Sequence, residues 1–544
     1  MITLTLAAAI GLSAAAPGHD HDHGAQLGQV SFQSTCNAAA PGALVRGLGW
    51  LHSFEYALAE QAFAAAATAD PTCAIAQWGV AMTYYHPLWA PPSPAELEKA
   101  ITALATARTA GARSEREQDY IAALETFYRD SATVDHKTRA FAYAAALDQL
   151  SKRYPDDREA ALFHALQLVA VGMMDQDPDY AHEKAAAAIL NRLLPDAPNH
   201  PGVAHYLIHG FDYPALATLG LQAARRYASI APASAHAQHM PSHIFVRLGL
   251  WDEAIRSNLA SAAAAQALAK RQGFADSSSE RLHAMDYLAY AYLQTGQDSN
   301  AGRVLADLKA IKRADPPIFS VAYAATAIPA RMLLERRLWR EAATLDLPEN
   351  VRTLAPLDSF QWAEAHLFFA RSVGAARSGN AAVAREAAAK LAAIEQAMSV
   401  PPGTYDWRKQ VSIERQVAEA WLAHAEGRNN DAERLMRAAA VLDDATEKHP
   451  VTPGSILPAR EQLGELLLEL GRPGDAAAEF AASLKRAPRR FAALYGAAKA
   501  ARLAGNMSAA RHYYAELLDV AGNAGSARAE IREARAHLSR RAAR

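Results

Sequence analysis

The chain has 544 residues and a formal net charge of −2, from 55 basic and 57 acidic side chains. This length exceeds what a single hydrophobic core usually serves, so the chain forms either several domains or one solenoid. The balanced charge excludes an electrostatic nucleic-acid binder, and outside the N-terminus no apolar run reaches the ~18–20 residues of a membrane-spanning helix.

Residues 1–16, MITLTLAAAIGLSAAA, have the apolar core and small-residue end of a secretory signal peptide. They contain no Lys or Arg, and Pro17 follows them, so a disordered alanine-rich tail is the alternative. We therefore expect a periplasmic or secreted protein, and otherwise a cytoplasmic one. Residues 17–30 contain GHDHDHG, which predicts a flexible tail that binds divalent metals weakly, or else a short solvated tail.

Cys36 and Cys73 are the only two cysteines of the chain. An even pair in an exported protein predicts a disulfide. If the protein stays in the cytoplasm, two buried thiols are the alternative.

A repeat of about 34 residues organises the sequence. Near the C-terminus small residues, an alanine, an aromatic residue and a proline recur in a fixed frame, at Gly464, Gly471, Ala476, Phe480 and Pro488, and again at Ala498, Gly505, Ala510 and Tyr514. The same frame appears near the start at Gly47, Ala59, Phe63, Ala66 and Pro71, and in part at Gly249/Ala254, Gly296/Ala301, Arg337/Ala342 and Gly427/Ala432. Small residues let two antiparallel helices approach, the aromatic ring fills the space between them, and proline ends the second helix.

These residues resemble the tetratricopeptide repeat (TPR) superfamily, strongly over 455–520 and well over 47–82. The chain also resembles a group of bacterial TPR-repeat proteins that share DPTCAIAQWGVAM, an HPG…H block and HMPSHIFVRLGLW. The resemblance implies an all-α, TPR-like α-solenoid built of antiparallel helix pairs, and it supplies no activity. A concave groove that binds a peptide or protein partner follows from the same resemblance.

We expect one continuous array with four parts. They are N-terminal TPR-like repeats over 31–200, a His-rich helical segment over 201–300, degenerate repeats over 301–450, and C-terminal repeats with a capping helix over 451–544.

Six of the twenty histidines lie between His200 and His243, which is far denser than an even spread. His205/His209 and His239/His243 are H-x-x-x-H pairs, and residues four apart share one face of a helix. Asp212 follows His209 by three residues, whereas His200 and His236 fall at predicted turns. The prediction is a transition-metal site with ligands His205, His209, His239 and His243, and with Asp212 as ligand or as orienter of an imidazole.

No H-E-x-x-H motif is present, and no cysteine lies nearby, so neither a zincin nor a finger-type zinc site is indicated. The donor set suits Zn, Fe, Cu, Ni or Mn without choosing among them. Further candidates for the site, each with a structural role as the alternative, are His283, Asp286, His52 and His86. Glu461, Arg225 and Arg226 are expected on solvated faces, and Trp78 and Trp89 in the core or the groove.

The leading functional hypothesis is an exported TPR-like protein with a His/Asp metal site on the inner face of the solenoid. Such a site would serve a metal-dependent enzyme of unknown substrate, since no phosphate-loop, dinucleotide or Ser–His–Asp signature competes with it. The alternatives are a non-enzymatic scaffold for peptide or protein partners, and a metal-binding or delivery protein.

Overall fold

The computed structural model describes residues 26–271, 273, 276–522 and 528–539 of the chain. The predicted signal peptide and the GHDHDHG segment lie outside these residues. Within them the protein is all-α, with helices that pack mainly on their neighbours in sequence, which confirms the predicted TPR-like solenoid. Two short parallel strands, β1 (Ser277–Ser278) and β2 (Ala314–Asp315), pair between helices.

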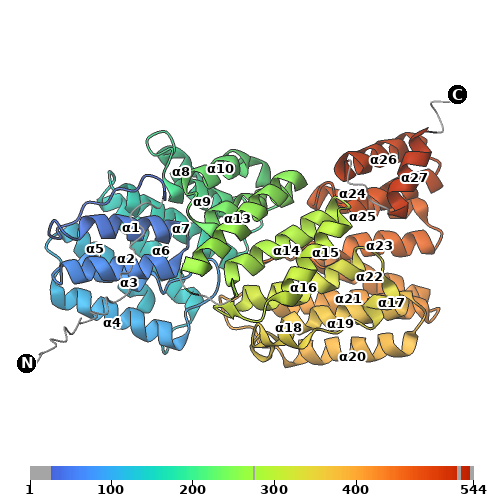
Figure 1. Ribbon diagram of the computed structural model, residues 1–544, viewed down its shortest axis with the longest axis horizontal. Coiled ribbons are helices and arrows are strands. Elements are labelled where there is room, and N and C mark those ends of the chain that lie inside the picture. Colours follow the sequence, from blue (N-terminus) through green and yellow to red (C-terminus); the bar gives the residue numbers. More distant parts are fainter. Residues whose placement is uncertain (1–25, 272, 274–275, 523–527, 540–544) are drawn as a thin grey trace, which may run out of the picture.

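The N-terminal helices fill one side of the molecule in Figure 1, coloured blue to cyan. A disulfide joins Cys36 to Cys73, with their α-carbons 4.8 Å apart, and so ties the segment before the first helix to the start of the third. These helices are α1 (Pro41–His52), α2 (Tyr56–Ala69), α3 (Ala74–Met82), α4 (Pro94–Ala110), α5 (Glu115–Tyr128), α6 (His136–Arg153), α7 (Arg158–Asp175) and α8 (Ala181–Leu193).

Three short helices, α9, α11 and α12, lie in the histidine-rich segment, and the long helix α13 and then α14 lead toward the second half of the molecule (Figure 1). The histidine-rich segment comprises α9 (Pro201–Gly210), α10 (Ala217–Ile230), α11 (Ala235–His239), α12 (Pro241–Arg247) and α13 (Trp251–Arg271).

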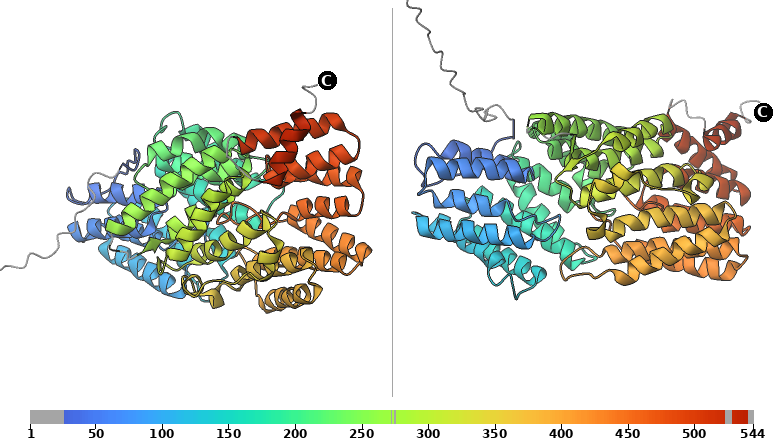
Figure 2. Two further views of the ribbon diagram at one scale, coloured as in Figure 1. Left: turned by 45° about the vertical axis from the view of Figure 1, so that its right-hand side comes forward. Right: turned by 60° about the horizontal axis from the view of Figure 1, so that its bottom comes forward.

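The second half, yellow-green to red, is again a run of helix pairs (Figures 1 and 2). It contains α14 (Ser279–Gln294), α15 (Asp298–Ala310), α16 (Phe319–Leu334), α17 (Trp339–Ala343), α18 (Glu349–Thr353), the 3-10 helix η1 (Leu357–Ser359), α19 (Gln361–Arg377), α20 (Ala381–Ala397), α21 (Trp407–Ala425), α22 (Asn429–Asp444), α23 (Ala459–Glu469), α24 (Pro473–Arg486), α25 (Phe491–Leu503), α26 (Met507–Ala521) and α27 (Ala529–Ser539).

The repeat residues act in packing as their positions predict. Phe480 is fully buried, and a β-carbon on Gly464 would lie 2.8 Å from its ring, while one on Gly496 would lie closer still. At the other end Phe63 occupies the same place, because a β-carbon on Gly47 would lie 2.7 Å from it. Small residues on the flanking helices are therefore required wherever the aromatic side chain fills the space between them.

The solenoid also turns back on itself, so that residues far apart in sequence meet. Gly249 has a φ of +66° and packs so tightly on Pro488 that a β-carbon would lie 2.5 Å from the Pro488 carbonyl oxygen. Both its conformation and this approach favour glycine. The same turn brings residues 447–450 against α12 and α14, where Glu447 pairs with Arg247 and the Pro450 carbonyl accepts from Tyr287 Oη. Lys448 Nζ in this segment lies 2.9 Å from Asp212 Oδ2.

One surface prediction is wrong. Glu461 is only 1% exposed and forms an ion pair with Arg490, which is itself buried and lies 2.7 Å from Glu335. A charged residue this deep is tolerated because a buried guanidinium from the following repeat satisfies it. Arg225 is exposed, as expected, and pairs with Glu253.

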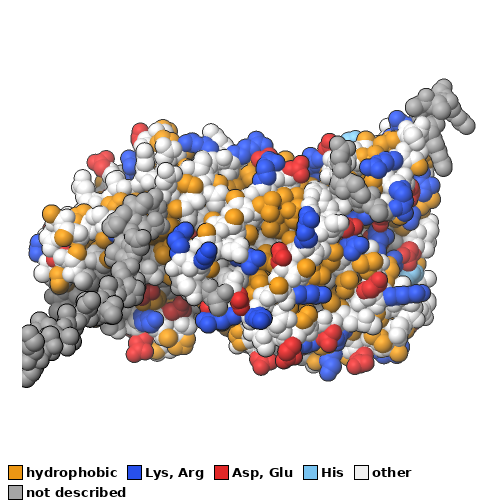
Figure 3. All heavy atoms as spheres, viewed as in Figure 1, with side chains coloured by type: hydrophobic (Ala, Val, Ile, Leu, Met, Phe, Trp, Pro, Cys, Tyr) orange, Lys and Arg blue, Asp and Glu red, His pale blue; other side chains and the backbone are white. Residues whose placement is uncertain are grey.

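Among the described helices none is both long and apolar enough to span a membrane. On the face shown in Figure 3, basic and acidic side chains are interspersed over both halves of the molecule.

Candidate metal centre

Three short helices and the start of α14 present the histidines. α9 begins at Pro201. Proline suits the first turn of a helix, because the N–H group that it lacks would have no acceptor within the helix there. His200 caps this helix, since its Nδ1 accepts the Gly202 N–H at 3.2 Å. His205 and His209 then lie one turn apart on α9, as predicted, and both are buried.

α11 and α12 follow one another with only Met240 between them, and Met240 itself has a right-handed helical conformation. His236, His239 and His243 are spaced three and four residues apart along this stretch, so they line one side of it. α14 contributes His283 from its first two turns.

The structure divides these histidines into two groups. The first triad is His205, His209 and His236, and the second triad is His239, His243 and His283. Within each triad one nitrogen from each ring lies within 4.8 Å of the others, and all six side chains are buried. Each predicted H-x-x-x-H pair thus stays together but gains a third partner, and the two pairs belong to different groups.

In the first triad, His205 is the central ring. Its Nδ1 lies 2.6 Å from the carbonyl oxygen of His52, which can only accept, so Nδ1 carries the hydrogen and Nε2 carries the lone pair. The Nε2 atoms of His209 and His236 each lie 3.1 Å from His205 Nε2. Burial and the neighbouring His209 and His236 hold the pKa of His205 well below its ordinary value.

In the second triad, the contacts of two rings likewise place the hydrogen on Nδ1. His239 Nδ1 lies 2.7 Å from Asn258 Oδ1, and the Asn258 amide is oriented because its Nδ2 donates to the Ala254 carbonyl at 2.8 Å. His243 Nδ1 lies 2.9 Å from Asp212 Oδ2. Both Nδ1 atoms therefore donate, and both Nε2 atoms carry lone pairs.

These two lone pairs face each other, because His239 Nε2 and His243 Nε2 are 3.0 Å apart. A proton between them is disfavoured: burial lowers the pKa of His243 to about 4 despite the opposing effect of Asp212, and burial with neighbouring histidines holds the pKa of His239 well below its ordinary value. His283 adds a buried ring whose two nitrogens have no hydrogen-bond partner among the described residues. A cation bound by all three rings would satisfy this arrangement.

The spacing fits a metal. Three nitrogens bound tetrahedrally at ~2.1 Å would lie about 3.4 Å from one another. The closest nitrogen pairs here are 3.0–3.1 Å apart.

The two triads adjoin. The ring centroids of His209 and His243 are 6.0 Å apart, and those of His236 and His239 are 6.4 Å apart. Aromatic rings enclose the group, including Phe54 at 4.4 Å and Tyr227 at 5.0 Å from His205, and Tyr287 at 4.6 Å from His239. Six imidazoles thus form one buried cluster with two centres.

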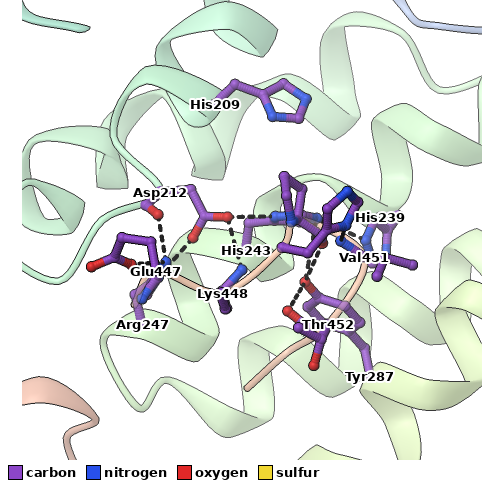
Figure 4. A network of polar contacts seen from close by, with 12 residues as sticks. His209, Asp212, His239, His243, Arg247, Tyr287, Glu447, Lys448, Val451 and Thr452 are labelled. Atoms are coloured by element: carbon purple, nitrogen blue, oxygen red, sulfur yellow. Dashed lines mark hydrogen bonds and ion pairs between the residues drawn. The ribbon is translucent and has the colours of Figure 1, made fainter. Parts of the chain in front are cut away.

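Asp212 belongs to neither triad. It lies between the ring of His243 and the cations Arg247 and Lys448 (Figure 4). Arg247 Nε lies 2.8 Å and Lys448 Nζ lies 2.9 Å from its carboxylate oxygens. Burial acts to raise the pKa of Asp212, but Lys448 and Arg247 outweigh it and hold the pKa well below its ordinary value. The ionised Asp212 carboxylate accepts from His243 Nδ1 and so fixes the orientation of that ring.

A third group contains His52 and His200 on either side of Glu159, and we call it the Glu159 cluster. His52 Nε2 lies 2.7 Å and His200 Nε2 lies 2.9 Å from the two carboxylate oxygens. The remaining nitrogens are also partnered, because His52 Nδ1 lies 2.7 Å from Tyr206 Oη and His200 Nδ1 accepts the Gly202 N–H. Every polar atom here has a partner, so the cluster is complete without a cation.

The remaining candidates lie elsewhere. Asp286 is turned to the buried Arg331, although it follows His283 by three residues on α14. His86 Nε2 lies 3.0 Å from the Thr83 carbonyl, and His86 belongs to none of the three groups. Trp78 is buried in the N-terminal core, whereas Trp89 packs against His283 with ring centroids 5.6 Å apart.

Sequence reasoning missed several residues of this cluster. His236 was expected at a turn but lies in α11, and its H-x-x-H spacing to His239 was the available signal. Asn258 lies on the following helix α13, and Lys448 comes from a distant segment; nothing in their local sequence indicates a role at the cluster. Glu159, at the centre of the third group, was missed in the same way.

A cavity of about 280 Å³ leads to the first triad, and we call it the His209 cavity. His209 and Asp212 form part of its wall. Five carboxylates and one lysine line it: Asp177, Glu183, Asp212, Asp444, Glu447 and Lys448.

Comparison with known proteins finds no family model and no curated protein that matches the chain. Among solved structures the chain is similar to TPR-repeat and related helical proteins at low identity. It matches the human IFIT1 dimer with m7Gppp-AAAA at 12% identity and a TM-score of 0.37, over 87% of this chain and 95% of that chain. It matches Naa15/Naa10 bound to HypK-THB at 14% identity and 0.24, over 92% and 74%, and the P58(IPK) TPR domain at 12% and 0.20, over 92% and 99%. These likenesses are too distant to bear on what this chain binds.

Proposed function

We propose that the protein binds two transition-metal ions side by side, one in each histidine triad. The observation that carries this proposal is the contact between His239 Nε2 and His243 Nε2, two lone pairs 3.0 Å apart in a buried place where protonation is disfavoured. A cation converts that repulsion into coordination. The first triad, where one lone pair of His205 faces two nitrogens, supports a second ion.

The ligand atoms restrict which metals and which type of site are compatible with the triads. Three neutral imidazoles without a thiolate suit Zn, Cu, Fe or Ni better than Mg or Ca. Three protein ligands leave a coordination position open, as in catalytic rather than structural sites. We therefore favour a metal-dependent enzyme with a two-metal centre, in which the open positions receive the substrate.

The surrounding residues would hold the ligands in place. His52 O, Asn258 Oδ1 and Asp212 Oδ2 each accept an Nδ1 hydrogen and so direct the opposite nitrogen into the cluster. Such partners fix the ring orientation and raise the basicity of the ligand. The acidic wall of the His209 cavity favours the entry of cations.

That acidic wall also favours a second candidate, a carrier that stores and delivers metal. The enzyme and the carrier differ in how fast they release metal. We expect a carrier to lose its ions to a chelator such as EDTA at neutral pH within minutes, and an enzyme to retain them through turnover. A scaffold for peptide or protein partners, with structural histidines, requires no metal.

Elemental analysis of the purified protein tests the proposal. We expect about two metal ions per chain, about one in His205→Ala and about one in His239→Ala, because each substitution removes a ligand of one triad. His424→Ala is the matched control, since His424 is partly exposed on α21 and belongs to no triad. Wild-type protein that stays free of metal after supplementation with Zn(II) and Cu(II) would contradict the proposal.

We also propose that the protein is exported. The Cys36–Cys73 disulfide supports this, because such bonds persist in oxidising compartments. Mass spectrometry of the mature N-terminus tests it: a chain that still begins at Met1 would contradict export.

A further inference from the structure

A second, larger cavity of about 400 Å³ lies between the two halves of the molecule. One wall comes from the loop at 87–91 and the end of α7, and the other from residues 359–362, 398–407 and His449. Six aromatic side chains line it, and we call it the aromatic cavity: Trp89, Phe319, Phe360, Trp362, Tyr405 and Trp407.

The lining of the aromatic cavity is uncharged. None of its described lining residues is Asp, Glu, Lys or Arg. Its two histidines are neutral at physiological pH, because burial and Arg139 lower the pKa of His136 to about 4, and burial lowers that of His449 to about 3. A charged ligand would lose its hydration here without gaining a counter-ion, so the cavity selects an uncharged one.

The shape of the wall suits a flat ligand. Trp362 and Trp407 stack with ring centroids 3.9 Å apart and an angle of 8° between their planes, and Tyr405 meets Trp407 edge-on at 4.9 Å. Flat aromatic faces of this kind bind planar rings by stacking or edge-to-face contact. His136 Nδ1 is buried without a hydrogen-bond partner in the part of the chain that the structure describes, and it offers a polar contact to a ligand that carries a hydroxyl group.

The aromatic cavity adjoins the metal centre in two ways. It shares Met173, Gln176 and Tyr405 with the His209 cavity, whose wall contains a ring of the first triad. Its Trp89 packs against both triads, with ring centroids 6.0 Å from His236 and 5.6 Å from His283. The Trp89 loop is also tied to the opposite wall, since its carbonyl oxygen accepts from His449 Nε2 at 3.4 Å.

We propose that the aromatic cavity binds an uncharged aromatic molecule with a hydroxyl group, and that this ligand reaches the first triad through the boundary at Met173, Gln176 and Tyr405. The approach to the triad rests on the proposed function, whereas binding in the cavity does not. The proposal on the ligand of the aromatic cavity and the proposal on metal binding can therefore be contradicted independently.

Calorimetric titration with 2-naphthol tests the binding step, with 2-naphthoate as a ligand of similar size that is anionic. We expect one molecule of 2-naphthol per chain and binding of 2-naphthoate at least about ten-fold weaker, because the cavity offers no cation. The same result is expected after treatment with a chelator, so the measurement does not depend on metal. Equal affinity for both ligands, or no binding of 2-naphthol, overturns the proposal.

A charge placed in the wall locates the ligand. Met398→Lys puts an ammonium group into the lining, and we expect it to weaken 2-naphthol binding at least about ten-fold. Met507→Lys is the control, because Met507 is an exposed residue on α26, away from the cavity. Equal affinities in the two variants overturn the assignment to this cavity, and circular dichroism verifies that both variants fold.

Nuclear relaxation tests the approach to the triads. In protein loaded with Cu(II), we expect the proton signals of bound 2-naphthol to broaden relative to protein loaded with Zn(II), because Cu(II) is paramagnetic. Identical line widths overturn the approach to the metal centre. Failure of the protein to take up either metal contradicts the proposed function and leaves the calorimetric result on the cavity standing.

Discussion

The second triad and the Glu159 cluster have a similar spacing between their side chains, but they differ in how their hydrogen-bond donors and acceptors are matched. Each brings three buried side chains within 4.8 Å, and each contains at least two histidines. In the Glu159 cluster, carboxylate oxygens accept from both rings, and Tyr206 and the Gly202 N–H satisfy the remaining nitrogens. In the second triad, two ring nitrogens that both carry lone pairs face each other.

The difference teaches that proximity alone does not identify a metal site. A group whose donors and acceptors balance is a structural network, and a group with surplus acceptors needs a cation. The two regions are also linked, because the carbonyl oxygen of His52 in the Glu159 cluster orients His205 in the first triad.

The largest expected effect falls on the Glu159 cluster. Burial acts to raise the pKa of Glu159, but His52 and His200 outweigh it and keep the carboxylate ionised. Glu159→Ala leaves both buried rings without their acceptor, so we expect the free energy of unfolding to fall by about 3–5 kcal/mol, with or without metal. Urea denaturation measures it. Glu253→Ala, which removes a pair with the exposed Arg225, should cost less than about 1 kcal/mol, and a similar loss in both variants would contradict the balanced network.

A fall in pH gives a reference for this comparison, because it shows how buried neutral histidines outside both regions change the free energy of unfolding. Burial and Arg331 lower the pKa of His366 to about 3, and burial with Arg139 lowers that of His136 to about 4. The unfolded chain takes up these protons near pH 6.5 and the folded chain does not, so stability is full above that pH and falls as the pH drops toward 4. Each histidine contributes up to about 1.4 kcal/mol per pH unit.

Denaturation of metal-free protein between pH 7 and pH 4.5 measures this slope. His366→Phe should make the slope shallower by the share of one histidine. A free energy of unfolding that stays flat over this range in the wild type would show that these rings are protonated in the folded protein.

The next prediction separates the two triads. Asn258→Leu removes the acceptor of the His239 Nδ1 hydrogen, so we expect metal affinity to fall about 10–100-fold in the second triad and to stay unchanged in the first. Ser261→Ala is the matched control, because Ser261 lies on the same helix, is buried and bonds α11 through the Ala235 carbonyl without touching an imidazole. Competition with a chromophoric chelator gives both affinities. Equal weakening at the two sites would show that Asn258 acts through the fold and not through His239.

The smallest expected effect concerns His283. Because neither of its nitrogens has a hydrogen-bond partner within the described residues, His283→Phe should leave the stability of metal-free protein within about 1 kcal/mol of the wild type, or raise it. Its metal content should fall from about two ions to about one. His200→Phe strips a partner from Glu159, so it should cost about 1–3 kcal/mol in the same metal-free protein. If both substitutions cost the same, the distinction between the two regions fails.

Local sequence patterns determined the helical repeats and the two histidine pairs. The frame around Phe63 and Phe480 predicts close helix pairs because an aromatic ring needs small residues opposite it, and Pro201 and Pro241 mark where α9 and α12 begin. His205/His209 and His239/His243 share helix faces by spacing alone. Each of these relations spans a few residues or one repeat, which is the range over which periodicity carries information.

Only the tertiary structure decided how the pairs are grouped and completed. His236 joins the first pair and His283 the second, Asn258 and Asp212 orient rings from separate segments, and Lys448 arrives from more than two hundred residues away. Glu461, expected on the surface, is buried beside Arg490, which also pairs with Glu335 from a distant segment. These contacts depend on how the solenoid turns back on itself, and that path is the sum of many small rotations between repeats that no local spacing specifies.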